Sequence, residues 1–447
     1  MVRERPNPAR QRGRAEPHRG MAHNLGLIFF PAYDWSISAD HPEREERLLY
    51  TQDQLREEGL FDFPGIVEYR PQVADEEDVC RAHVRPPGVP RLAGLPHLVS
   101  AGGAITAGRL VLSGECRKSF ALVRPPGHHA MRVVHGGRGF CNINNEAIMV
   151  ERLRHEFGVR RVAIVDTDCH HGDGTQDIYW HDPDTLFISL HQDGRTLYPG
   201  SGFVDEFGGP KARGSTINIP LPPGTGDEGF LLAADRIVRP ILDEWRPDLV
   251  VNSAGQDNHF TDPITNMKIP AHGYAALSAI IDPDIAVLEG GYSIKGALPY
   301  LNLAIAMSMA GLDWSRVEEP RPAEFELATD ARTLDYIERL ADIIHRARRN
   351  PEAVESGSTR QGDWWVRERS VFYDTHTLEG GGRGYQGSIH EQQREALSDC
   401  PDCPGVLVIH TRSEVSRPST HVLPHRRACP KCLELAAEME AEANLGG

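Results

Sequence analysis

The sequence Asp166-Thr-Asp-Cys-His-His-Gly-Asp173 follows directly after the apolar run Val162-Ala-Ile-Val165. This run is short, rich in β-branched residues and preceded by two arginines, which is typical of an interior strand of a parallel sheet. In open α/β sheets, ligands bind in the loops at the carboxyl ends of the strands. We therefore expect an α/β fold with a functional site at this edge of the sheet.

The same stretch contains residues that can bind a metal ion. Asp168 and His170 are two positions apart, so in an extended chain their side chains leave the same face and can hold one cation. A set of carboxylate and imidazole ligands suits zinc, and fewer than four protein ligands leave a position for water. For this stretch alone, a polar turn with an aspartate as helix cap is an equally good interpretation.

Composition describes a globular protein. The chain has 447 residues, of which 40% are hydrophobic and 25% charged, and this length suggests two or three domains. The formal net charge of -16 disfavours nucleic acid or an anionic membrane as the main partner. Residues 1–22 are rich in Arg, Pro and Gly and predict a disordered tail, with Met21 as an alternative start. The sequence shows neither a secretory signal nor a run of about 20 apolar residues, so we expect a cytoplasmic protein.

Apolar strands alternate with amphipathic helices from residue 23 to about residue 350, which predicts βαβ units in one large domain. The predicted strands are 27–30, 121–123, 162–165, 186–190, 216–219, 249–253 and 286–288. The predicted helices include 43–58, 145–157, 228–245, 296–311 and 330–349. The last of these has apolar residues at helical spacing, which favours packing on the domain.

Two adjacent histidines follow the predicted strand 121–123, in the motif Arg-Pro-Pro-Gly-His128-His129-Ala. Adjacent imidazoles can serve as a base and an electrostatic partner if carboxylates orient them differently. Asp166 and Asp173 are available for this purpose. The alternative is a pair of surface histidines, which is the commoner explanation of an isolated HH motif.

Two further strand ends carry polar groups. Asp257 follows strand 249–253 and completes a three-ligand set with Asp168 and His170, which leaves zinc open to water and substrate. Glu289-Gly-Gly-Tyr292 follows strand 286–288. Its glycines let the backbone approach a ligand closely, and the tyrosine hydroxyl can donate to a developing oxyanion. A turn with a packed aromatic ring is the alternative for this motif alone.

Together these motifs resemble the histone deacetylase family, in the broad sense that includes acetylpolyamine amidohydrolases and acetoin-utilisation proteins. The matching motifs occur in the family's order over residues 25–312. They are HPER (41–44), RPPGHHA (124–130), GFCNINN (139–145), DTDCHHGDGT (166–175), YPGSG (198–202), SAGQD (253–257) and LEGGY (288–292). Chance agreement across so many separate motifs is negligible.

The resemblance implies the arginase/deacetylase fold, a three-layer α/β/α domain around a central parallel sheet of eight strands. It implies a zinc-dependent amidohydrolase that removes an acetyl or other acyl group from an acylated amine, which is either a small molecule or a protein lysine. The residues carried over are the zinc ligands Asp168, His170 and Asp257, the tandem His128 and His129 with their partners Asp166 and Asp173, and the carbonyl-polarising Tyr292. We expect His129 to act as general base and later as acid, and His128 to stabilise charge.

The same resemblance implies a substrate tunnel and a monovalent-cation site. The tunnel residues are expected to be Phe140, Tyr198, Ile264, Gly290 and Gly291. The monovalent cation is expected to be potassium, held by main-chain carbonyls near Asp166, Asp168 and His170, with Ser189 and Leu190.

The chain departs from its relatives at two positions that govern substrate choice. Many protein deacetylases carry an acidic residue in the loop before the first catalytic strand, but residues 84–113 contain no Asp or Glu. Polyamine-preferring relatives can carry a glutamate directly after an Asp-Pro pair, whereas Ile264 follows Asp262-Pro263. The physiological substrate and the preferred acyl chain stay open.

Two CxxC pairs near the end of the chain, Cys400 with Cys403 and Cys429 with Cys432, predict a zinc ribbon. Four thiolates make a closed tetrahedral site, and we favour structural zinc over a redox function. We assign residues 395–447 to this zinc-ribbon-like module with its terminal helix, and residues 351–394 to an irregular linker. The partner of the ribbon and the oligomeric state stay open.

Two other functions compete with that of a deacetylase. The large domain could be a non-catalytic acyl-binding or interaction scaffold that carries the zinc ribbon, but the complete catalytic set favours an enzyme. An arginase-like ureohydrolase needs a two-metal carboxylate cluster, and the tandem histidines and the tyrosine of LEGGY speak against it.

Overall fold

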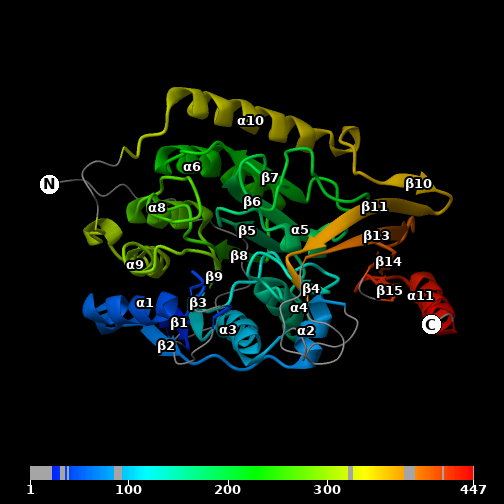
Figure 1. Cartoon of the computed structure of the whole chain (residues 1–447), viewed down its shortest axis with the longest axis horizontal. Helices are drawn as coiled ribbons and strands as arrows, with labels where there is room; N and C mark the ends of the chain where they lie inside the picture. The colour runs from blue at the N-terminus through cyan, green and yellow to red at the C-terminus, as the bar shows by residue number, and fades with distance from the viewer. Residues whose placement is uncertain are drawn as a thin grey trace.

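The centre of the molecule is an eight-stranded sheet in which neighbouring strands pair in parallel (Figure 1). The structure, a computed structural model, describes residues 23–30, 36–37, 40–84, 93–320, 326–376, 388–414 and 417–445. The tail predicted for residues 1–22 lies outside them. In spatial order the strands are β2 (Ile66–Tyr69), β1 (His23–Phe29), β3 (Cys116–Leu122), β9 (Ile285–Leu288), β8 (Leu249–Ala254), β5 (Val162–Asp166), β6 (Thr185–Gln192) and β7 (Thr216–Leu221). The predicted eight-stranded parallel sheet is confirmed.

Helices cover both faces of this sheet. Successive residues of β5 point to opposite sides, so that Ala163 and Val165 join one apolar cluster while Val162 and Ile164 join another. The helices that pack in the first cluster are α1 (Glu46–Glu57), α6 (Asp227–Ala233), α7 (Arg239–Trp245), α8 (Ala271–Ile281), α9 (Leu298–Ala310) and α10 (Ala331–Arg349). Those in the second are α2 (Glu76–Ala82), α3 (Leu95–Leu112), α4 (Asn145–Phe157) and α5 (Asp173–Tyr179). The result is the predicted three-layer α/β/α arrangement.

Several elements of the large domain differ from the sequence predictions, and the helices α2, α3, α5 and α8 were not among the predicted ones. The predictions missed β2, an edge strand of four residues in which only Ile66 is buried, so its apolar pattern is weak. The single helix predicted over 228–245 is α6 and α7 joined by a π-helical turn, Ala234–Val238. Pro240 has no N–H to donate back to the Arg236 carbonyl, which instead accepts a hydrogen bond from His345 Nε2 at 2.7 Å.

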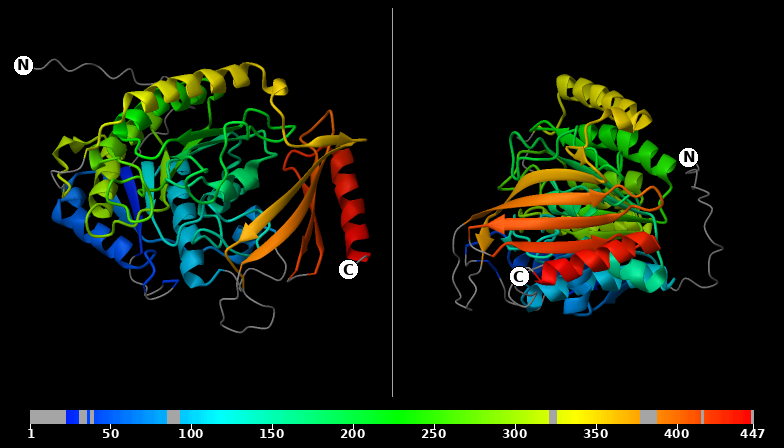
Figure 2. Two further views of the ribbon diagram at one scale, coloured as in Figure 1. Left: turned by 45° about the horizontal axis from the view of Figure 1, so that its top comes forward. Right: turned by 90° about the vertical axis from the view of Figure 1, so that its right-hand side faces the viewer.

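A second, antiparallel sheet lies beside the large domain (Figure 2). Its strands, in spatial order, are β10 (Thr359–Gln361), β11 (Trp364–Tyr373), β13 (Ile389–Ser398), β14 (Val406–Ser413) and β15 (Ser419–Pro424). Val406 and Val408 of β14 pack with residues of α11 (Pro430–Leu445), whereas Leu407 and Ile409 pack on Val133 of the large domain. We call residues 359–445 the C-terminal module.

The irregular linker predicted over residues 351–394 is wrong for much of its length, because β10, β11 and the first part of β13 lie there. Three inward-facing side chains of β13, those of Glu391, Gln393 and Glu395, are polar and buried, and they lie between the apolar Ile389 and Leu397. Glu391 forms an ion pair with His135, and Glu395 with His181 at 3.0 Å. Polar partners on the large domain therefore replace, in the middle of β13, the apolar alternation that normally reveals a strand.

The helix α10 begins at the predicted position and lies along the large domain (Figure 1). Asp330 caps its first turn by accepting from the backbone N–H groups of Arg332 and Thr333. Its buried residues Ile337 and Ile344 belong to the first apolar cluster, as the helical spacing predicts. Among the described helices, including this one, none is long and apolar enough to cross a membrane.

Candidate active site

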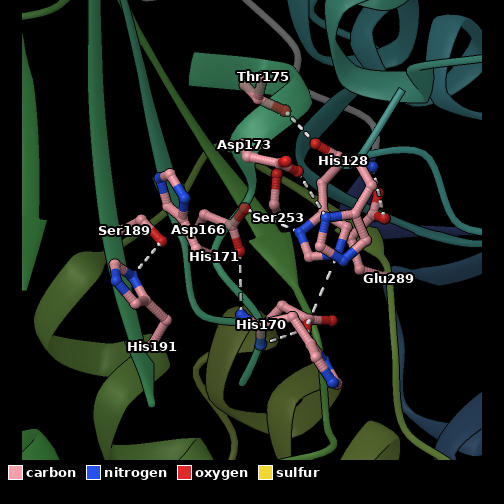
Figure 3. Close-up of polar contacts among 12 residues, drawn as sticks. His128, Asp166, His170, His171, Asp173, Thr175, Ser189, His191, Ser253 and Glu289 are labelled. Atoms are coloured by element: carbon pink, nitrogen blue, oxygen red, sulfur yellow. Dashed lines mark hydrogen bonds and ion pairs between the residues drawn. The ribbon is translucent and has the colours of Figure 1, made fainter. Parts of the chain in front are cut away.

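The tandem histidines lie in the loop after β3, at the edge of the sheet that carries the carboxyl ends of the strands. His128 Nδ1 lies 3.0 Å from Asp166 Oδ2 at the end of β5 (Figure 3). His129 Nδ1 lies 2.8 Å from Asp173 Oδ1 in the first turn of α5. Burial raises the pKa of Asp173, but the Arg138 guanidinium outweighs burial and holds this pKa well below its usual range, so the carboxylate only accepts and His129 Nδ1 carries the proton. The structure brings these four buried residues together.

The two histidines have opposite pKa shifts. Burial lowers the pKa of His128, but the carboxylates of Asp168 and Asp166 outweigh burial and hold this pKa well above its usual range. Burial, followed by the positive charge of His128, lowers the pKa of His129 to about 3. At neutral pH His128 is therefore charged and His129 is neutral, so His129 is the ring that can accept a proton on Nε2.

Asp168, His170 and Asp257 form a compact set of buried metal-ligand groups beside the histidines. Their ligand atoms all lie within 4.8 Å of one another. His170 Nδ1 is 3.1 Å from Asp168 Oδ1 and 2.9 Å from Asp257 Oδ2. Two buried carboxylates at this distance require positive charge between them. The donor set therefore fits a zinc ion with three protein ligands.

A glycine is required where the backbone passes these carboxylates. A β-carbon at Gly290 would lie 2.5 Å from Asp257 Oδ2 and 2.6 Å from Asp168 Oδ2. The Gly290 N–H also donates to Asp168 Oδ2 at 2.8 Å. Gly290 therefore leaves space for both carboxylates and orients one of them.

We expect Gly290→Ala to weaken zinc binding by about tenfold or more, because the added methyl displaces two ligand side chains. The measurement is a zinc competition titration against a chelator of known affinity. Gly296→Ala is the matched control in the same loop, since a β-carbon there makes only an ordinary contact, 3.5 Å from Ser293 Oγ. Equal zinc affinity in the two variants would contradict the expectation.

Tyr292 lies in the loop after β9 and is held on several sides. Its N–H donates to Asp262 Oδ2 at 2.8 Å, and the Arg47 guanidinium carbon lies 5.0 Å from the centre of its ring. The Phe140 ring meets it edge-on with centroids 5.6 Å apart. Burial raises the pKa of the Tyr292 hydroxyl well above its usual range, so this group stays protonated and can donate a hydrogen bond.

Two supporting residues of the site were missed by the sequence analysis. Glu289 Oε2 accepts from the N–H groups of Gly127 and His128 at 2.7 and 3.0 Å. Arg47 donates to the carbonyls of Glu289 and Gly291 at 2.5 and 2.8 Å. Glu289 thus fixes the histidine loop, and Arg47 fixes the loop that carries Tyr292. The acidic residue within LEGGY was a visible signal for Glu289, but no motif pointed to Arg47.

The expected tunnel residues lie in different environments. Tyr198 meets the His129 ring edge-on with centroids 5.2 Å apart, and Phe140 meets His41 edge-on at 4.3 Å. Phe140 has a φ of 70°, a left-handed conformation that turns the chain sharply at this point. Gly290 passes beside the metal-ligand set and Gly291 beside Gln256 and Leu298, whereas Ile264 is 37% exposed. The structure thus brings Tyr198 to His129 and Phe140 to Tyr292, and leaves Ile264 at the surface.

The segments expected to hold a monovalent cation are neighbours in the sheet. Asp166 of β5 is paired with Ser189 of β6, and Leu190 follows in the same strand. Ser189 Oγ lies 2.8 Å from His191 Nδ1 (Figure 3). The loop that carries Asp168 and His170 continues directly from β5.

Four thiols converge in the C-terminal module. The Sγ atoms of Cys400, Cys403, Cys429 and Cys432 lie within 4.8 Å of one another, and all four cysteines are free of disulfide bonds. Cys400 Sγ is 3.8 Å from Cys429 Sγ, and Cys403 Sγ is 3.5 Å from Cys432 Sγ. This arrangement fits a closed structural zinc site.

Comparisons with known proteins agree with this geometry. The sequence-family model described as the histone deacetylase domain matches residues 95–309 of this chain. A probable deacetylase of Archaeoglobus fulgidus is 47% identical over 66% of this chain and 89% of its own length. The acetoin utilization protein AcuC of Bacillus subtilis is 30% identical over 64% of this chain and 82% of its own length. A histone deacetylase-like amidohydrolase of Pseudomonas aeruginosa is 38% identical over 50% of this chain and 60% of its own length.

A solved structure, that of the HDA15 HD domain, covers 74% of this chain and 97% of its own with a TM-score of 0.63. At 24% identity it supports the fold alone. The archaeal relative carries more weight, because it is nearly half identical and is covered almost from end to end. On this evidence the chain belongs to the histone deacetylase family and is an enzyme of the deacetylase class.

Proposed function

We propose that this deacetylase is a zinc-dependent amidohydrolase that removes an acetyl or other acyl group from an acylated amine, either a small molecule or a protein lysine. The observation that supports this most directly is the meeting of two carboxylate-oriented histidines with a three-ligand metal set. A non-catalytic scaffold would not need two buried imidazoles that are each oriented by a carboxylate beside metal ligands.

Asp168, His170 and Asp257 would hold the zinc ion. When bound, zinc lowers the pKa of water and polarises the substrate carbonyl. The ligand atoms of these three residues lie within 4.8 Å of one another, so a single ion could contact all three. Phe140, Tyr198, Ile264, Gly290 and Gly291 are proposed to line the acyl channel.

The chain's own residues carry the proton transfers. His129 Nε2 accepts a proton from the attacking water while Asp173 keeps the other nitrogen protonated. The same ring then donates this proton to the leaving amine. His128 remains charged beside Asp166 and stabilises negative charge at the reacting centre, and the Tyr292 hydroxyl donates to the developing oxyanion. The products are a free carboxylate and an amine.

Two further ions belong to the proposal. Cys400, Cys403, Cys429 and Cys432 would hold a second, structural zinc ion in the C-terminal module. Main-chain carbonyls around Asp166, Asp168 and His170, together with Ser189 and Leu190, would hold potassium. The adjacency of β5 and β6 supports this second assignment.

Turnover of the zinc-loaded protein tests the main proposal. The panel is an acetyl-lysine peptide, acetylated polyamines and a short aliphatic amide, and acetate release is measured. We expect Tyr292→Phe to lower kcat/KM by about a hundredfold to a thousandfold, because one oxyanion donor is lost. Wild-type rates in Tyr292→Phe would exclude the tyrosine from the reaction. No turnover of any amide by zinc-loaded protein would favour the acyl-binding scaffold.

A further inference from the structure

The end of β11 reaches the residues proposed to line the acyl channel. Asp374, which follows β11 directly, accepts two hydrogen bonds on Oδ2: one from the Tyr198 hydroxyl at 3.0 Å and one from the Gly139 N–H at 2.7 Å. The Asp374 N–H donates to the Gly137 carbonyl at 3.0 Å. Since Gly139 precedes Phe140, a single carboxylate of the C-terminal module holds both proposed channel walls.

Tyr198 connects this carboxylate to the proposed general base. Its ring lies edge-on to His129, with centroids 5.2 Å apart, and the Arg138 guanidinium carbon lies 5.8 Å from the centre of the tyrosine ring. The Tyr198 hydroxyl is therefore held by Asp374 while its ring borders His129. A change in the orientation of Tyr198 alters the packing around His129.

A second connection reaches the same histidine through Arg138. This guanidinium donates from one nitrogen to the Phe372 carbonyl of β11 and from another to Asp173 Oδ2. The other oxygen of Asp173 lies 2.8 Å from His129 Nδ1. The end of β11 thus contacts His129 by two routes, one through Tyr198 and one through Arg138 and Asp173.

The loop between the tandem histidines and Phe140 rests largely on the C-terminal module. Met131 packs in one apolar cluster with Val371, Tyr373 and Ile389. The Tyr373 hydroxyl donates to the Val133 carbonyl at 2.5 Å. The short strand β12 (Thr375–His376) pairs with β4 (Gly136–Gly137). The module therefore supports this loop with apolar packing, a side-chain hydrogen bond and backbone pairing.

We propose that Asp374 is a positioning residue for the deacetylase reaction. By accepting from Tyr198 and Gly139 it fixes the two channel walls, and through Tyr198 it fixes the surroundings of His129. This inference rests on the proposed function and adds to it a part of the active site that lies outside residues 95–309, the extent of the family match. The C-terminal module is then a component of the active site rather than an appended domain.

The variants Asp374→Ala and Asp374→Asn separate hydrogen bonding from charge. The amide oxygen of asparagine can accept from both Tyr198 and Gly139, whereas alanine accepts from neither. We expect Asp374→Ala to lower kcat/KM on the best substrate by about tenfold or more, through a higher KM as well as a lower kcat, and Asp374→Asn to stay within about threefold of wild type. Glu368→Ala, at an exposed site on β11, is the matched control and should behave as wild type.

A double-mutant cycle with Tyr198→Phe tests the route of the effect. If Asp374 acts through the Tyr198 hydroxyl, the double variant Tyr198→Phe/Asp374→Ala should lose little more than the worse single variant. Fully additive losses would overturn this route. Equal activity of Asp374→Ala and Glu368→Ala would overturn the inference. The inference would also be overturned if Asp374→Asn lost as much activity as Asp374→Ala, because such a loss would indicate that the charge contacts substrate directly.

Binding of an alkyl hydroxamate, measured by calorimetry on zinc-loaded protein, distinguishes failure of the inference from failure of the proposed function. This probe chelates zinc and places an aliphatic chain between the channel walls. We expect Asp374→Ala to bind it about tenfold more weakly at unchanged zinc content. If Asp374→Ala binds the probe more weakly but the wild-type protein turns over no amide, the inference is supported and the proposed reaction is contradicted. Wild-type affinity in an active Asp374→Ala would overturn the inference alone.

Discussion

Replacing His129 by alanine is expected to lower kcat by about a hundredfold to ten-thousandfold, which is the range for loss of a general base. The physical reason is the difference between the two histidines. Burial and the charge of His128 keep the His129 pKa at about 3, so this ring is neutral and can take the proton of water. His128, with its pKa held well above the usual range beside Asp168 and Asp166, cannot replace it.

The measurement is steady-state acetate release at saturating substrate, with the zinc content and the thermal unfolding midpoint of each variant determined in parallel. His155→Ala is a suitable control, because His155 is exposed on α4. Loss of turnover with zinc retained would support His129 as the base. If His129→Ala keeps full zinc-dependent turnover, another group accepts the proton and the assignment is wrong.

We expect the variant Cys400→Ser to lose the zinc ion of the C-terminal module and much of the folded structure of this module. Structural zinc sites in small modules contribute about 10–16 kcal/mol of apparent binding free energy, and this binding is coupled to folding. The cysteine cluster packs with Val406 and Val408 of β14, so loss of the metal frees the connection between β14 and α11. We expect bound zinc to fall from two equivalents to one, and residues 395–435 to become sensitive to protease.

Cys80→Ser is the matched control for this experiment, because Cys80 is exposed and lies outside the cluster. It should retain both zinc equivalents and full protease resistance. If Cys400→Ser retained both ions, or if chelation left residues 395–435 folded, structural zinc would be excluded. In the second sheet, β13 lies between β14 and β11. We therefore expect loss of the ribbon zinc to lower turnover as well, by about the same factor as the variant Asp374→Ala.

The strand ends of the large domain could be predicted because their signals are local. The runs before Asp166, Asp257 and Glu289 are apolar, and each is followed at once by polar residues. The structure places these runs in β5, β8 and β9, at the centre of the parallel sheet. Since neighbouring parallel strands bring their carboxyl ends to one edge, the meeting of the polar residues follows from the topology.

The contribution of β11 could not be predicted in this way. Asp374 bonds to Tyr198 and Gly139, which are far from it in sequence, and no metal-ligand or catalytic spacing marks it. The strand that precedes it has a continuous polar run, Arg367-Glu-Arg-Ser370, between two apolar runs, so the stretch was predicted as part of an irregular linker. Long-range polar contacts between domains have no signature in the periodicity of a single sequence.

The buried charges between the two sheets have a consequence for how this protein can evolve. His135 and His181 of the large domain face Glu391 and Glu395, and Asp182 lies 2.9 Å from Arg426. Deleting the module would remove these partners and would expose to solvent the apolar side chains of Met131 and Val133, which pack against it. Several compensating substitutions would have to arise together before a lineage could dispense with the module. The C-terminal module is therefore difficult to lose, and we expect the large domain and the module to be inherited as one unit among close descendants.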